Sequence, residues 1–325
     1  MSILVTGAAG FVGYHAAQAL LAAGESVVGL DNLNDYYDPA LKRSRIARLA
    51  ARPGFRFETM DLADHEVVCD FVLSERPSRI LHLAAQAGVR YSIDNPFAYA
   101  RSNLLGHLSV LEAARALGED LAHLVYASSS SVYGECAKVP FREEDAAETP
   151  VSLYAATKRA DELMSASYSS LYGIPATGLR FFTVYGPWGR PDMAYWLFAE
   201  AMLEGRPIKV FNKGEMERDF TYIDDVIEPL GRILADSPQR GRHKVYNIGG
   251  SAPVRLMDMI EALERALGVT AQKIMLPMQP GDVSRTCADT SRLQADYGYA
   301  PKVRIEDGLQ RFAGWFRDWR SGTAG

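Results

Sequence analysis

A glycine-rich turn near the N-terminus constrains the fold of this chain more than any other feature. The apolar run at residues 3–6 leads directly into Gly7-Ala8-Ala9-Gly10-Phe11-Val12-Gly13, and a helical pattern follows over residues 12–23. Glycines at this spacing allow a tight turn, close approach of the backbone to a pyrophosphate, and close packing of helix on strand. The helix N-terminus adds free N–H groups and a partial positive charge. This order predicts a dinucleotide site, and a glycine-rich turn without a ligand is the alternative.

Short apolar runs alternate with helical patterns through the first half of the chain. The apolar runs occupy residues 3–6, 26–30, 79–84, 121–127 and 176–182, and a further helical pattern covers residues 154–171. Runs of this length suit strands that are buried on both faces of a sheet. The alternation predicts an α/β fold with a doubly wound parallel sheet of the Rossmann type.

Asp31 ends the second apolar run, 24 residues after Gly7. A carboxylate there can bond the adenosine ribose hydroxyls and would repel a 2′-phosphate. The next residues, Asn32, Leu33 and Asn34, include no arginine. NAD is therefore predicted rather than NADP, with a solvated turn residue as the alternative role for Asp31. Asp61 and Leu62 follow another strand-like run and are candidates to contact the adenine.

The chain becomes less regular after Val184, where glycines and prolines mark a loop. We predict that residues 1–183 form an NAD-binding Rossmann domain. Residues 184–325 would form mainly a smaller C-terminal α/β domain for the substrate. The run at 245–248 resembles a strand of the main sheet, so residues from about 219 to 250 are expected to rejoin the first domain.

A tyrosine, a lysine and a serine cluster suggest acid–base chemistry. Tyr154 and Lys158 lie four residues apart, on one face of the expected helix. The run 128–131 consists of serines and follows an expected strand, where open α/β sheets bind ligands. Taking a hydride from a carbinol carbon requires a base for the hydroxyl proton. A free tyrosine holds its proton up to about pH 10, so nearby positive charge must stabilise the phenolate, and Lys158 can supply it. The alternatives are a serine-rich turn and a surface pair.

Composition excludes several other classes of protein. The net charge of −5 and the lack of a basic run argue against nucleic-acid binding. The three cysteines, Cys69, Cys136 and Cys287, are far apart, so neither a disulfide framework nor a metal site is expected, and reduced, mostly buried thiols are predicted. No signal peptide and no apolar stretch of membrane-spanning length is seen. We predict a cytoplasmic protein.

The chain resembles the extended short-chain dehydrogenase/reductases, and most closely the UDP-glucuronate 4-epimerases. The resemblance covers nearly the whole sequence. It rests on GAAGFVG, GLDNLNDYYD (29–38), LAAQAGVRYSIDNP (83–96), YASSSSVYG (126–134), PVSLYAATK (150–158), LRFFTVYGPWGRPDMA (179–194) and RDFTYIDDV (218–226). It implies NAD-dependent inversion of C4 of UDP-glucuronic acid through a transient 4-keto sugar, giving UDP-galacturonic acid. Tyr154 would be the acid/base, Lys158 would favour its ionised form, and Ser129 would orient the C4 hydroxyl. A homodimer is implied as well.

The resemblance also assigns binding residues. The cofactor would contact Gly7, Gly10, Phe11, Val12, Gly13, Asp31, Asn32, Asp61, Leu62, Leu83, Ala84, Ala85, Asn103, Tyr154 and Lys158. The substrate would contact Arg90, Ser129, Ser131, Thr183, Arg190, Arg218, Asp282 and Arg285. Among these, Arg190 is the candidate for the C6 carboxylate, with Thr183 and Ser131 as hydrogen-bond donors. Arg218 and Arg285 would meet the diphosphate, and Asp282 the uridine ribose. Each arginine could instead be an ordinary surface residue.

Related enzymes differ at a few positions. Sugar-nucleotide 4,6-dehydratases carry an Asp-Glu pair where Ser130 and Ser131 stand, and UDP-glucuronate decarboxylases usually carry a glutamate in place of Ser131. UDP-galactose 4-epimerases commonly have asparagine in place of Thr183. UDP-glucose 4-epimerase and UDP-glucuronate decarboxylase remain the closest alternatives. A non-catalytic dinucleotide-sensing module is more remote, since such modules typically lose the tyrosine or the lysine.

Overall fold

The computed structural model describes residues 2–134, 138–279 and 282–323. The chain divides into two structural units. Unit 1 comprises Met1–Glu135, Glu143–Phe181 and Ile227–Tyr246, and unit 2 comprises Cys136–Arg142, Phe182–Val226 and Asn247–Gly325. Both units are therefore discontinuous in sequence.

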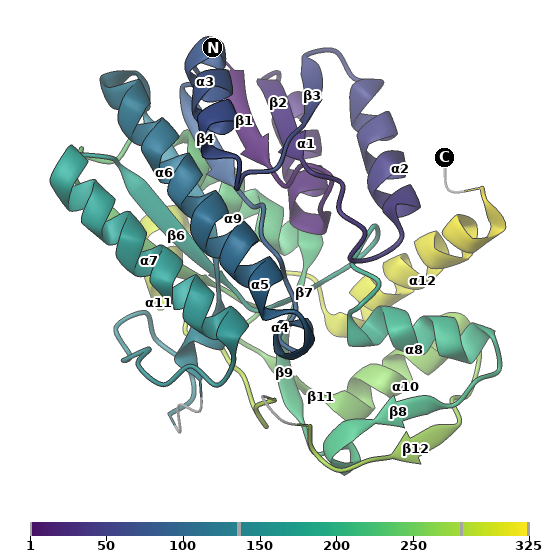
Figure 1. Ribbon diagram of the computed structural model, residues 1–325. Coiled ribbons are helices and arrows are strands. Elements are labelled where there is room, and N and C mark those ends of the chain that lie inside the picture. The colour runs from purple at the N-terminus through teal and green to yellow at the C-terminus, as the bar shows by residue number, and fades with distance from the viewer. Residues whose placement is uncertain (1, 135–137, 280–281, 324–325) are drawn as a thin grey trace. The chain divides into compact units, whose positions relative to one another are not determined.

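Unit 1 is built on a seven-stranded sheet with the order β10-β6-β5-β4-β1-β2-β3 (Figure 1). Its strands are β1 (Ser2–Thr6), β2 (Ser26–Asp31), β3 (Phe55–Thr59), β4 (Arg79–His82), β5 (His123–Ser129), β6 (Ala176–Phe181) and β10 (His243–Ile248). The neighbours from β3 across to β6 pair in parallel. The predicted doubly wound parallel sheet is confirmed. The winding reverses between β1 and β4, and sheets of this kind bind ligands at that point.

Helices cover this sheet, and their apolar faces complete its core. They are α1 (Phe11–Ala22), α2 (Pro39–Ala50), α3 (His65–Glu75), α4 (Tyr91–Asp94), α5 (Pro96–Tyr99), a π-helix (Ala100–Leu105), α6 (Gly106–Leu117), α7 (Leu153–Tyr172) and α9 (Ile223–Ala235). Helices α3, α6 and α7 lie next to one another (Figure 1). Val68 of α3 and Leu111 of α6 pack in one cluster with Ile80 of β4 and Leu124 of β5. Burial of this cluster fixes the sheet whose strand ends carry the site.

The predicted strand at 79–84 is too long, because β4 ends at His82. The amide of Leu83 still donates to the carbonyl of Thr6, at 3.1 Å. The next amide, that of Ala84, donates to the Thr6 hydroxyl instead, at 3.2 Å. The chain thus leaves the ladder at this point. The strand expected at 121–127 is displaced as well: β5 begins at His123 and extends to Ser129.

Unit 2 contains two small sheets, four complete α-helices and a 3-10 helix (Phe211–Gly214) within the residues described. One sheet has the order β11-β9-β7, and in the other β12 pairs with β8. The strands are β7 (Thr183–Tyr185), β8 (Ile208–Val210), β9 (Glu217–Tyr222), β11 (Pro253–Arg255) and β12 (Lys273–Met275). The helices are α8 (Ala194–Leu203), α10 (Leu256–Leu267), α11 (Ser291–Tyr297) and α12 (Ile305–Ser321). Helix α10 packs against both α8 and α12.

All four tryptophans of the chain lie in unit 2 and form one cluster. The ring of Trp188 lies 5.2 Å from that of Trp315 and 5.4 Å from that of Trp319. Trp196 of α8 lies 5.4 Å from Trp315. Trp188 has a φ of 57°, a left-handed conformation that is strained for such a residue. Its burial in the cluster stabilises the loop that carries Arg190 two residues later.

The described residues offer no helix that is long and apolar enough to cross a membrane. Cys69 and Cys287 are free thiols, of which Cys69 is half-buried and Cys287 buried. Cys136, the third predicted thiol, lies outside the described residues.

Candidate active site

The glycine turn between β1 and α1 has the geometry that a phosphate cradle requires. Gly7 has a φ of +71°, and a Cβ there would lie 2.7 Å from the backbone nitrogen of Ala84. A Cβ at Gly13, in the first turn of α1, would lie 2.0 Å from the carbonyl oxygen of Gly7. Any side chain at either position would push strand, turn and helix apart. Gly10 is the N-cap of α1, so Phe11, Val12 and Gly13 present the first free amides of the helix.

Asp31 ends β2 and ties that strand to the glycine turn. Its carboxylate accepts hydrogen bonds from the amides of Leu33, at 2.8 Å, and Ala9, at 3.2 Å. Burial raises the pKa of Asp31, although Lys42 acts in the opposite direction. Lys42 and Arg45 both come from α2, and neither is predictable from the residues next to Asp31. Arg45 donates to the carbonyl of Ala9, at 2.7 Å.

The predicted cofactor residues gather at the carboxyl ends of neighbouring parallel strands. Gly7 follows β1, Asp31 ends β2 and Asn32 follows it. Asp61 and Leu62 come after β3, and Leu83, Ala84 and Ala85 come after β4. Parallel strands end at the same edge of a sheet, so these positions lie together. Together with the glycine turn and Asp31, they fit a dinucleotide such as NAD.

Asn103 is buried in the π-helix and connects two parts of this edge. Its side chain exchanges hydrogen bonds with the backbone of Gln86, at 2.8 and 3.1 Å. It also donates to the hydroxyl of Thr157 in α7, at 3.0 Å. Asn103 therefore fixes the segment after β4 against the helix that carries Tyr154 and Lys158.

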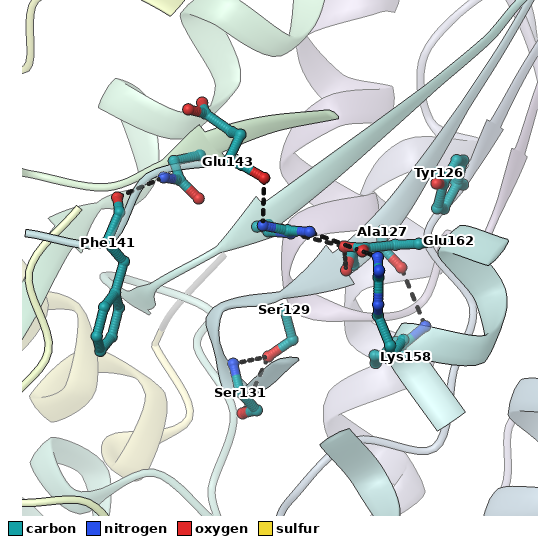
Figure 2. A network of polar contacts seen from close by, with 12 residues as sticks. Tyr126, Ala127, Ser129, Ser131, Phe141, Glu143, Lys158 and Glu162 are labelled. Atoms are coloured by element: carbon teal, nitrogen blue, oxygen red, sulfur yellow. Dashed lines mark hydrogen bonds and ion pairs between the residues drawn. The ribbon is translucent and has the colours of Figure 1, made fainter. Parts of the chain in front are cut away.

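Lys158 is held against the end of β5. Its ammonium donates to the carbonyl of Ala127, at 3.0 Å (Figure 2). It also donates to the carboxylate of Asp161, at 3.0 Å. Ser129 follows two residues after Ala127, and its hydroxyl donates to that of Ser131, at 3.1 Å. The lysine and the serine pair are thereby fixed to one strand end.

Tyr154 lies in the first turn of α7, one turn before Lys158. Ser152 is the N-cap of this helix, and its hydroxyl accepts a hydrogen bond from the amide of Ala155, at 3.1 Å. The Tyr154 side chain is half-buried, and its ring lies 6.0 Å from the ring of Tyr99. The cap and this contact set the position of the phenol. Tyr154, Lys158 and the serine cluster all belong to unit 1.

A buried charge network lies beneath this group and was not predicted. Glu162 accepts two hydrogen bonds from Arg180 of β6, at 2.7 and 2.8 Å, and one from Ser128, at 2.6 Å. Burial opposes the charged form of Glu162, but its hydrogen bonds with Arg180 and Ser128 outweigh this and lower its pKa. The Arg180 guanidinium also lies over the ring of Tyr133, 4.7 Å from its centroid. The sequence signal for this network is the charged Arg180 within the apolar run at residues 176–182.

The predicted substrate arginines of unit 2 make ion pairs. Arg190 contacts Asp192 through two nitrogens, with Nε at 3.0 Å from Oδ1. Arg218 of β9 donates to Asp282, at 3.2 Å, so two residues predicted at the nucleotide end lie in contact. Arg285 pairs with Glu217, at 2.8 Å. Thr183 begins β7, and Arg90, in unit 1, immediately precedes α4.

Residues 3–249 match the model of the NAD dependent epimerase/dehydratase family. The chain belongs to this family. It is 46% identical to a probable UDP-glucuronate 4-epimerase of Rhizobium meliloti, over 97% of each chain. Among solved structures, it is similar to a UDP-glucuronic acid 4-epimerase from Bacillus cereus in complex with UDP-glucuronic acid and NAD. That chain is 36% identical, with a TM-score of 0.91, and 98% of this chain and 100% of that one are covered. A UDP-glucose 4-epimerase from Thermotoga maritima with UDP-glucose is 30% identical, with a TM-score of 0.89, covering 98% and 100%.

Proposed function

We propose that this protein is an NAD-dependent UDP-glucuronate 4-epimerase, which interconverts UDP-glucuronic acid and UDP-galacturonic acid. One observation carries the chemistry: the Lys158 ammonium is fixed to the strand end that bears Ser129, one helical turn from the Tyr154 phenol. The identity of 46% to a probable UDP-glucuronate 4-epimerase over nearly the whole chain supports the choice of substrate.

The proposed reaction needs one proton acceptor that later returns its proton. Ser129 orients the C4 hydroxyl, and the Tyr154 phenolate takes its proton. NAD held at the glycine turn and Asp31 would supply the hydride acceptor for C4 and the hydride donor for the return step. The sugar passes through a 4-keto form, turns its other face, and receives hydride and proton on that face. Tyr154 returns the proton, so no net oxidation occurs.

In this proposal Lys158 favours the ionised form of Tyr154 during proton removal. The cofactor lies along Gly7, Gly10, Phe11, Val12 and Gly13. Asp31 bonds the ribose hydroxyls. The remaining contacts are assigned to Asn32, Asp61, Leu62, Leu83, Ala84, Ala85 and Asn103.

We assign the nucleotide sugar mainly to unit 2. Arg190 is proposed to bind the C6 carboxylate. Its guanidinium donates two hydrogen bonds to the carboxylate of Asp192, which supports this assignment. Thr183 and Ser131 are proposed as further donors, and Arg90 as a sugar contact. Arg218 and Arg285 would meet the diphosphate, and Asp282 the ribose of uridine. A fixed carboxylate matters because the 4-keto form is a β-keto acid, which can lose CO2.

We also propose that the protein is a cytoplasmic homodimer. Large apolar side chains are exposed on unit 1: Phe97 on α5 (84% exposed), Leu163 (57%) and Leu171 (68%) on α7. Covering such residues favours association with a second copy. Light scattering should give twice the chain mass, and Leu163→Glu together with Leu171→Glu should reduce it to one. A wild-type monomer would contradict this proposal.

The activity is tested by incubating the NAD-loaded protein with UDP-glucuronic acid, without added reductant, and identifying the sugar by NMR. We expect UDP-galacturonic acid and no accumulation of NADH, and no conversion by Tyr154→Phe. A UDP-pentose with CO2 would instead identify a decarboxylase. The structural similarity to a UDP-glucose 4-epimerase makes that activity the second candidate. Turnover of UDP-glucose but not of UDP-glucuronic acid would establish it.

A further inference from the structure

Tyr154, Lys158 and Asp161 form a stripe along one face of α7. Their spacing of four and then three residues places them on consecutive turns. An ammonium has three N–H donors. Lys158 uses one for the carbonyl of Ala127 and one for Oδ2 of Asp161, each at 3.0 Å. The side chains of Lys158 and Asp161 are only 3% and 0% exposed, so water screens their interaction weakly.

The Asp161 carboxylate uses only part of its hydrogen-bonding capacity within the described residues. Its second carboxylate oxygen, Oδ1, is buried and accepts no hydrogen bond from the described part of the chain. Burial raises the pKa of Asp161 to about 6, although Lys158 acts in the opposite direction. Lys158 is therefore the main group that stabilises the negative charge of Asp161, and this carboxylate in turn strongly affects the electric field of Lys158.

The other titratable groups described around the Lys158–Asp161 pair do not supply a negative charge in contact with Lys158. His82 of β4 and His107 of α6 are neutral near pH 7, because burial lowers the pKa of His82 to about 3 and that of His107 well below its usual value. Tyr126 of β5 is neutral too, because burial raises its pKa. Glu162, the next residue on α7, is engaged by Arg180 of β6. Asp161 is thus the carboxylate in direct contact with Lys158.

We propose that Asp161 is a positioning residue that weakens the positive field of Lys158 at the Tyr154 hydroxyl. The inference rests on the proposed epimerisation, in which Tyr154 must return the proton as readily as it takes it. An unopposed ammonium would favour the phenolate throughout, which would assist proton removal and hinder proton return. With Asp161 ionised, the protonation state of the Tyr154 phenol depends less on Lys158 and more on the charge of the bound cofactor.

The size of the effect follows from the helix geometry. Seven residues of α-helix span about 10 Å. At that distance, with an effective dielectric constant of about 20, one charge shifts a titration midpoint by about one pH unit. The removal of the Asp161 charge should therefore lower the midpoint of Tyr154 by about that amount.

The test is a phenolate titration by ultraviolet difference spectroscopy of the NAD-bound protein. The curve of the matching Tyr154→Phe protein is subtracted to isolate Tyr154. We expect Asp161→Asn to lower the midpoint by about one pH unit and the acid limb of kcat to move with it. Asp161→Glu, which keeps the charge, should stay near the wild type. A midpoint that is unchanged or raised in Asp161→Asn would overturn the proposal.

If Asp161→Asn does not fold, Asp161→Ser provides a smaller neutral side chain, and the same lowered midpoint is expected. The titration does not require turnover. Failure to convert UDP-glucuronic acid would therefore contradict the proposed function, whereas an unshifted midpoint would contradict the role of Asp161 alone.

Discussion

The ion pairs at the predicted sites of the two units lie in very different surroundings. In unit 1 the pairs Lys158–Asp161 and Arg180–Glu162 are at most 3% exposed. In unit 2 the Arg190 and Asp192 side chains are each 25% exposed, and those of Arg285 and Glu217 are 55% and 39% exposed. Buried pairs are costly to break because the remaining partner stays unpaired, whereas exposed pairs exchange with water or ligand at little cost. The predicted site of unit 1 therefore offers a fixed electrostatic environment, and that of unit 2 offers arginines that can exchange partners.

The sharpest test of this contrast is Glu162→Ala. The substitution leaves Arg180 buried without its carboxylate, and we expect the free energy of unfolding to fall by about 3–5 kcal/mol. Urea denaturation measures the loss. Glu228→Ala is the control in the same unit, because Glu228 pairs with Arg232 on the surface. Equal stability of the two variants would contradict the contrast.

The next largest effect is expected at Arg190. Arg190→Ala should lower kcat/KM for UDP-glucuronic acid by about 10- to 100-fold, the range for losing hydrogen bonds to a charged group. NAD affinity, measured by calorimetry, should change much less. Arg206→Ala is the control, since Arg206 pairs with Glu204 in the same unit. Turnover equal to that of the wild type would remove Arg190 from the proposed role.

A buried histidine gives unit 1 a pH dependence of stability. Burial lowers the pKa of His82 to about 3, so the unfolded chain binds a proton that the folded chain does not. This contribution is present above the unfolded pKa of about 6.5 and is lost as the pH falls. Between pH 7 and 5 the wild type should lose about 2 kcal/mol more than His82→Gln does. Denaturation at both pH values measures this, with His65→Gln as the control at an exposed position. Parallel losses in wild type and His82→Gln would contradict it.

The smallest effect is expected for the exposed pair of Arg285 and Glu217. Arg285→Ala should change the free energy of unfolding by less than about 1 kcal/mol, because water screens its pair with Glu217. Thermal denaturation is sufficient to measure this. A larger loss would mean that exposed pairs of unit 2 stabilise its fold, and the contrast would fail.

The parts of the site that depend on short-range order along the chain could be predicted from the sequence. Strand, glycines and helix follow one another in Ile3 to Gly13, and Tyr154 and Lys158 share one helix, so short-range spacing predicted their arrangement. The contacts of Asp161 with Lys158 are local too, but a carboxylate three residues from a lysine is common on exposed helices and did not indicate burial.

Long-range contacts were not predictable in the same way. Lys42 and Arg45 approach Asp31 only because α2 packs against α1 and β3, the strand next to β2. Arg180 reaches Glu162 only because α7 packs against β6. The exposure of Arg190 and its pairing with Asp192 depend on the shape of one loop, which spacing does not determine.

The tryptophan cluster has a practical consequence for observing this protein. Trp188, Trp196, Trp315 and Trp319 all belong to unit 2, and unit 1 holds no tryptophan in the sequence assigned to it. Intrinsic tryptophan fluorescence is therefore a built-in optical label for unit 2 alone. Because Trp188 lies two residues before Arg190, the emission should respond when a ligand rearranges that loop.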